Sequence, residues 1–88
     1  MKELFITLHV IAVKEEDGST TRHKKTGLEF EVLVSRIVYI REAAEWEKQN
    51  HKEAKGVKAA VKLTTGETLI TLGDAADIAV EVQNVYNG

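Results

Sequence analysis

The chain has 88 residues, of which 43% are hydrophobic and 30% charged, and its net charge is −2. This length and balance predict a single soluble domain over residues 1–88. The lack of cysteine excludes disulfides and thiolate chemistry, and the negative net charge gives no general attraction to nucleic acid or anionic membranes. We find no secretory signal and no stretch long enough to span a bilayer, so the sequence predicts a cytoplasmic protein.

Residues 4–13 form a nearly continuous apolar run that only Thr7 and His9 interrupt. Such a run predicts a strand that is covered on both faces, or covered on one face and used as an interface on the other. The two-residue period of a strand assigns its residues to two faces: Leu4, Ile6, Leu8, Val10 and Ala12 on one, and Phe5, Thr7, His9, Ile11 and Val13 on the other.

The next segment, residues 14–27, is polar and charged, with a turn at 17–19. Two interpretations stay open: a disordered loop, or a long, solvent-exposed hairpin extension, which Thr20 and Thr21 favour. Because segments of this length inside compact domains are often mobile or functional, residues 14–27 form a candidate insertion.

Alternating apolar residues predict a strand over 28–34, and a short run that is apolar on both faces predicts another over 37–41. Residues 35–36 break the alternation, which indicates a bulge or a tight bend. The segment 43–56 contains strong helix formers but few apolar positions, so it predicts a short, loosely held helix or a mobile insertion, with Gly56 as a helix cap.

A tight hairpin is predicted over residues 57–72. Apolar and polar residues alternate on both sides of Thr65-Gly66, which suits a two-residue turn because glycine accepts a positive φ without steric cost. That loop sets the register: Thr64 faces Glu67, Leu63 faces Thr68, Val61 faces Ile70, and Ala59 faces Leu72.

The last predicted element is an amphipathic helix. Asp74 can cap it, and Asp77 adds negative charge at the positive end of the helix dipole. The residues with helical spacing on one face are Ala75, Ile78, Ala79, Val82, Val85 and Tyr86. Because so short a helix is not stable alone, we expect this stripe to pack on the hairpin. A strand is the alternative, since positions 78, 80 and 82 are β-branched.

These elements predict an α+β fold: a small, mostly antiparallel sheet or partly open barrel of about five strands, with the C-terminal helix packed on one face. The pattern does not determine the order of the strands. The runs at 4–13 and 37–40 are apolar on both faces, whereas one helix covers one face of a sheet. We therefore expect an uncovered apolar face or edge, which invites a partner.

Parts of the chain resemble the small flagellar FlbD (SwrD) family. The residues similar to that family's I-x-x-I-E-type strand are Ile37, Ile40 and Glu42, and those similar to its hairpin and helix start are Leu63, Gly66, Ile70 and Asp74. The match covers roughly half of the chain; the segments 14–27 and 43–56 are additions to the family pattern. The resemblance implies a non-enzymatic accessory role in the flagellar motor.

Two features point to nucleic acid. Val38-Tyr39-Ile40, followed by a hairpin and a helix, is similar to LytTR DNA-binding domains, although those domains continue with further strands. Arg22, Lys24 and Lys25 form a basic cluster that could contact phosphates. A solvated charged loop is the favoured interpretation of this cluster, because acidic residues at 15–17 precede it and no aromatic residues interleave.

The remaining candidate residues give weaker evidence for a functional site. Trp46 either anchors a protein partner or pins its own segment to the sheet. The three histidines His9, His23 and His51 fit no zinc spacing, so we predict no metal site and no cofactor. No catalytic spacing and no phosphate loop are present, so we predict no catalytic residue and no enzyme.

The favoured function is therefore a non-enzymatic protein-interaction or structural module, with self-association as one form of it and no membrane partner. The candidate partner-binding residues are Trp46, Arg22, Lys24 and Lys25. The alternative is a nucleic-acid-binding module that uses the basic loop at 22–25.

Overall fold

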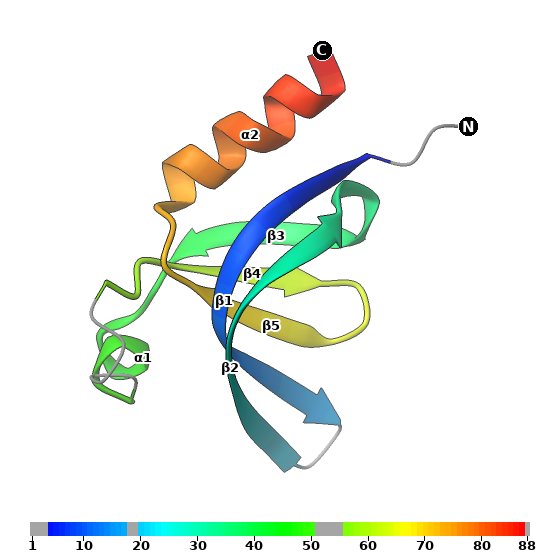
Figure 1. The fold of residues 1–88 in the computed structure, drawn as a ribbon. Helices are drawn as coiled ribbons and strands as arrows, with labels where there is room; N and C mark the ends of the chain where they lie inside the picture. Colours follow the sequence, from blue (N-terminus) through cyan, green and yellow to red (C-terminus); the bar gives the residue numbers. More distant parts are fainter. Residues whose placement is uncertain (1–3, 18–19, 51–55, 88) are drawn as a thin grey trace.

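The computed structural model of the protein describes residues 4–17, 20–50 and 56–87. Over these ranges the elements are, in order, β1 (Phe5–Asp17), β2 (Thr20–Leu33), the 3-10 turn η1 (Val34–Arg36), β3 (Ile37–Glu42), α1 (Glu45–Asn50), β4 (Ala59–Leu63), β5 (Glu67–Thr71) and α2 (Ala75–Asn87). The five strands form one open antiparallel sheet, and α2 packs against it (Figure 1). The predicted α+β class is confirmed.

β1 and β2 form a long, curved two-stranded ribbon (Figure 1). They pair from Phe5 opposite Leu33 to Asp17 opposite Thr20, so residues 14–17 and 20–27 are the hairpin extension rather than a loop. Residues 18–19 lie outside the described residues. Only the second half of β1 also pairs with β5, and the strand order is β2-β1-β5-β4-β3.

A β-bulge at Ile11 reverses the faces of β1. Both ladders of β1 shift register between Val10 and Ala12. Because a bulge inserts one extra residue, Val13 joins Val10 in the larger core, whereas Ala12 packs on the opposite face. The predicted faces of Ala12 and Val13 are therefore wrong, since strict alternation leaves no place for an inserted residue.

The β4–β5 hairpin is confirmed, but its predicted register is wrong by one residue. Val61 pairs with Leu69 and not with Ile70, and the other predicted pairs shift with it. The loop between the strands is one residue longer than predicted. The N–H of Gly66 donates to the carbonyl oxygen of Leu63 at 3.1 Å, and Gly66 has a φ of 96°. A type I turn followed by a left-handed glycine is the common three-residue hairpin loop.

The break predicted at 35–36 is a tight bend, formed by η1. The N–H of Val34 donates to the carbonyl oxygen of Leu4 at 2.9 Å, and the N–H of Thr64 donates to the carbonyl oxygen of Arg36 at 2.8 Å. These two bonds attach the bend to the start of β1 and to the β4–β5 loop. The chain can therefore pass from one edge strand, β2, to the other, β3.

The sheet is covered on both faces. The inner face, on the side of α2, holds the larger core of Ile6, Leu8, Val10, Val13, Val32, Val34, Ala59, Val61, Leu69 and Ile78. The outer face, turned away from α2, holds a smaller core of Ala12, Ala43, Val57, Ala60 and Ile70. Ala43 and Val57, on either side of α1, therefore cover part of the outer face, whereas Tyr39 on the same face stays half exposed. The expectation of an uncovered apolar face or edge that invites a partner stays a prediction.

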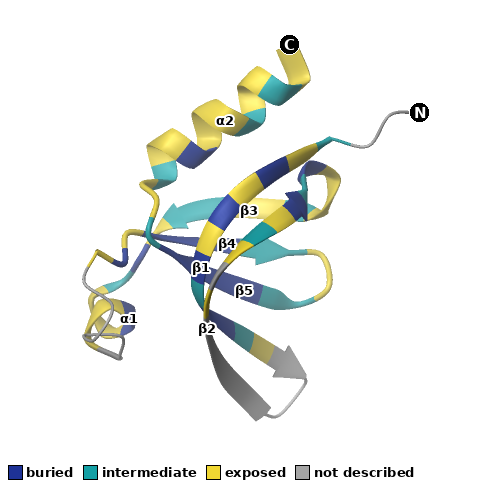
Figure 2. Cartoon of the chain, viewed as in Figure 1, coloured by how far each residue is buried: buried dark blue, intermediate teal, exposed yellow. Residues whose placement is uncertain are grey.

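α2 is confirmed as a helix, but it covers the inner face with only part of the predicted stripe. Ile78 is its buried residue, and Figure 2 shows the rest of the helix mostly exposed. Val82 and Val85 are half-buried, whereas Ala79 and Tyr86, which the spacing placed on the same stripe, are exposed. The stripe is narrower than predicted, because only Ala75, Val82 and Val85 join Ile78 in packing against the larger core.

Candidate functional site

A buried carboxylate holds α1 on the outer face. Glu47 is only 1% exposed. Its Oε1 accepts hydrogen bonds from Arg41 Nη1 at 2.6 Å and from the N–H of Ala44 at 2.8 Å, and its Oε2 accepts one from Arg41 Nη2 at 2.9 Å. Ala44 precedes the first helical residue, so Glu47 makes half of a capping box while it binds Arg41 in a bidentate manner. One side chain thus joins α1 to β3.

The same contacts set the charges of the pair. The hydrogen bond from Arg41 lowers the pKa of Glu47 although burial opposes this, and the N–H of Ala44 lowers it further. The hydrogen bond to Glu47 in turn raises the pKa of Arg41. The carboxylate therefore stays ionised and balances the guanidinium, which indicates a structural pair rather than a proton donor or acceptor.

A row of side chains crosses the outer face beside α1. Lys14 lies opposite Thr68, Thr68 opposite Lys62, and Lys62 opposite Tyr39, so these four residues of β1, β5, β4 and β3 share one face. Neighbouring strands lie about 4.8 Å apart, so the row spans roughly 14 Å. We call these four residues the Lys14–Tyr39 row.

Trp46, on α1, stands at one end of this row. The Nζ of Lys14 lies 4.7 Å from the centre of a Trp46 ring, which is cation–π geometry. Trp46 is 47% exposed and Tyr39, at the other end, is 46% exposed. Between them Thr68 is buried, and the Nζ of Lys62 donates to the carbonyl oxygen of Gly66 at 3.1 Å. Two half-exposed aromatic side chains therefore flank two lysines.

Trp46 contacts the sheet through Lys14 and still exposes about half of its surface, and its role as an anchor for a protein partner stays a prediction. Arg22, Lys24 and Lys25 belong to β2, where their backbones pair with residues 12–15 of β1, and their side chains lie outside the described residues. Lys25 lies opposite Ala12 of the outer face, whereas Lys24 lies opposite Val13 of the inner face.

Sequence reasoning missed the other residues of this site. Tyr39, Lys62 and Lys14 lie in three strands, and only the register of the folded sheet brings them into one row. Glu47 stands three residues after the helix cap, which is a weak signal for a capping box. That signal normally needs Ser or Thr at the cap, and here the cap is Ala44.

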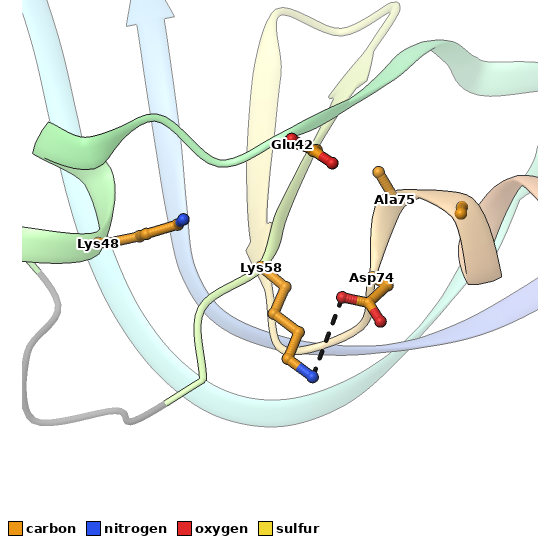
Figure 3. A pocket seen from close by; sticks show the side chains of 6 residues that line it. Glu42, Lys48, Lys58, Asp74 and Ala75 are labelled. Atoms are coloured by element: carbon orange, nitrogen blue, oxygen red, sulfur yellow. Dashed lines mark ion pairs between the residues drawn. The ribbon is translucent and has the colours of Figure 1, made fainter.

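A charged depression of about 450 Å³ lies where β3, α1, β4 and α2 meet (Figure 3). Glu42, Lys48, Lys58 and Asp74 line it, and Lys58 Nζ lies 3.9 Å from Asp74 Oδ1. Both side chains of this pair are more than half exposed, so solvent weakens the attraction. Among the described residues that line it, none carries a hydroxyl, thiol or imidazole group.

Metal-ligating side chains do not gather in groups of three or more anywhere in the described ranges. His9 is placed on an exposed position of β1. His51 and the side chain of His23 lie outside the described residues.

A second candidate surface lies along α2. The large hydrophobic residues that are exposed in the described chain are Phe5, Val38, Tyr39, Trp46, Val80 and Tyr86. Ala79 and Tyr86 are seven residues apart and share one flank of the helix, next to the half-buried Val82 and Val85. We call Ala79, Val82, Val85 and Tyr86 the α2 patch.

None of the helices described is both long and apolar enough to cross a membrane. In comparisons with known proteins, no family model matches the chain, and neither a curated protein nor a solved structure matches it. The resemblances to the FlbD and LytTR families therefore stay predictions, and the geometry of the two surfaces is the basis for proposing a function.

Proposed function

We propose that this chain is a non-enzymatic, cytoplasmic protein-interaction module that self-associates through the α2 patch. The observation that supports the proposal is the incomplete burial of α2, since Ile78 is the buried residue of a 13-residue helix. Tyr86 is 62% exposed, and Val82 and Val85 keep part of their surface open. An amphipathic helix of this length depends on packing for its stability, so a second apolar surface would stabilise it.

The chemistry of the α2 patch suits a second copy of the chain. The patch contains only apolar side chains and one phenol, so the same surface on another copy is complementary to it. The acidic residues Asp77 and Glu81 lie on the opposite side of the helix from Ala79 and Tyr86, as the spacing of 100° per residue requires. Glu81 stands four residues before Val85 and borders the patch on that side, so the contact between two copies centres on Ala79 and Tyr86.

Light scattering after size-exclusion chromatography tests the proposal over a range of protein concentrations. We expect a mass that approaches twice the 9.8 kDa of one chain as the concentration rises. Tyr86→Ser should return the mass to that of a monomer. Val80→Ser is the matched control, because Val80 is an exposed apolar residue of the same helix but lies outside the patch.

Two results would contradict self-association through this patch. One is a wild-type protein that stays monomeric at every concentration reached. The other is an equal change of mass in Tyr86→Ser and Val80→Ser, which would indicate non-specific association of exposed apolar residues rather than pairing of the α2 patch.

A further inference from the structure

The outer face combines two kinds of group that sequence-independent binding of single-stranded nucleic acid requires. Bases stack on exposed aromatic side chains, and a basic groove follows the phosphate backbone. Here Trp46 and Tyr39 each expose about half of their surface, and Lys14 and Lys62 lie between them in the Lys14–Tyr39 row. We infer that this face is a binding site for single-stranded nucleic acid, with bases on Trp46 and Tyr39 and phosphates at the two lysines.

The two aromatic side chains are held in place before any ligand arrives. Tyr39 belongs to β3, where pairing with Lys62 of β4 positions its backbone and a side-chain hydrogen bond joins it to Arg41. Trp46 belongs to α1, which the bidentate contact of Glu47 with Arg41 attaches to the same strand. A rigid platform of this kind lowers the entropy cost of ordering a flexible strand.

The dimensions of the row suit a short, extended stretch of nucleic acid. From the backbone of Lys14 to that of Tyr39 the row spans roughly 14 Å, which is room for an extended strand of a few nucleotides to follow it.

The net charge of −2 is that of the whole chain and not that of the outer face. Among the described acidic residues, Glu47 pairs with Arg41 and also interacts electrostatically with Lys14, and Glu45 is exposed on α1 beside Trp46, whereas Asp77 and Glu81 belong to α2 on the inner side of the sheet. The four residues of the Lys14–Tyr39 row itself include two lysines and no carboxylate. The row is also separate from the α2 patch, so binding here is independent of self-association.

The test uses the intrinsic fluorescence of Trp46, the single tryptophan of the chain. The full-length protein is titrated with oligo(dT) and, in a second arm, oligo(U), each of about 12 nucleotides. We expect saturable quenching at low salt. For two phosphate contacts the affinity should fall roughly sevenfold between about 50 and about 200 mM salt, because each contact contributes a slope of about −0.7. The two arms show whether DNA or RNA is preferred.

Three variants separate stacking from charge. Tyr39→Val keeps a strand-forming residue but removes the ring, and it should weaken binding at least fivefold or so, as the loss of one stacked base does. Lys62→Gln should reduce the salt slope by about 0.7. Lys58→Gln removes the same charge from the depression outside the row and should leave binding as it is in the wild type.

Several outcomes would overturn the inference. The absence of quenching and of a mobility shift at low salt would show that the face does not bind either strand. Equal binding of inorganic polyphosphate, unchanged by Tyr39→Val, would show attraction of anions without stacking. Equal losses in Lys62→Gln and Lys58→Gln would show a general charge effect, and equally tight quenching by an acidic polypeptide would assign the face to a protein partner.

Discussion

The contact of Glu47 with Arg41 and Ala44 gives the sharpest prediction about stability. In Glu47→Ala, the N–H of Ala44 loses its hydrogen-bond acceptor, and the loss of this helix cap lowers the free energy of unfolding by about 1 kcal/mol. The bidentate bond to Arg41 is also lost; it contributes about 1–2 kcal/mol, because Arg41 is partly exposed and water recovers some of its solvation. We expect the free energy of unfolding to fall by about 2–3 kcal/mol. For a domain of this size the melting temperature should then fall by about 10–20 °C.

Thermal and urea unfolding, followed by circular dichroism, measure this loss, and Trp46 emission reports on α1 separately. The matched control is Glu45→Ala, in the same helix, because the exposed Glu45 only meets Lys48 at 3.7 Å. That substitution should change the free energy by less than about 0.5 kcal/mol. If Glu47→Ala and Glu45→Ala prove equally stable, or if Trp46 emission stays unchanged in Glu47→Ala, the buried carboxylate does not hold α1.

The remaining predictions concern acid, the helix and the hairpin. Because the pKa of Glu47 is lowered on folding, its contribution to stability is complete above the unfolded value of about 4.3 and is lost as the pH falls through the lower folded value. Urea titrations at several pH values should therefore show a steeper acid loss in the wild type than in Glu47→Gln; parallel curves would contradict this. Ile78→Ala should cost about 2–4 kcal/mol in urea unfolding because it opens the larger core, whereas Val80→Ala should cost less than about 0.5; equal costs would mean that α2 does not pack as described. Gly66→Ala should cost about 1 kcal/mol or more by the same measurement, because its φ of 96° strains any side chain, and an unchanged stability would refute the three-residue loop.

Local patterns were sufficient to predict the β4–β5 hairpin and α2. The alternation around Gly66 predicts two paired strands, and the 3.6-residue spacing after Asp74 predicts α2, since each pattern depends on residues close together in the chain. The polar segment at 14–27 could not be decided in the same way. The backbone of this segment is extended because it pairs with β1, and the composition of the segment does not predict that pairing.

The predicted faces and strand register were wrong by one residue at two places. At each place one inserted residue reverses the face of every residue that follows it in the strand. The bulge at Ile11 moves Val13 to the inner face, and the longer loop at Gly66 moves Ile70 to the outer face. In both cases the alternation of the sequence stays the same on either side of the irregularity. A two-residue period cannot report where the backbone adds a residue, because both registers keep apolar residues paired.

The sequence by itself determined the fold class, which is α+β with an amphipathic C-terminal helix, because the spacing of residues decides local conformation. Tertiary structure alone decided which residues share a surface. Tyr39, Trp46 and the two lysines come from separate elements, and Glu47 is buried because Arg41 meets it on the far side of a turn. The physical reason is that side chains distant in sequence become neighbours only through strand pairing and packing, which depend on the whole fold.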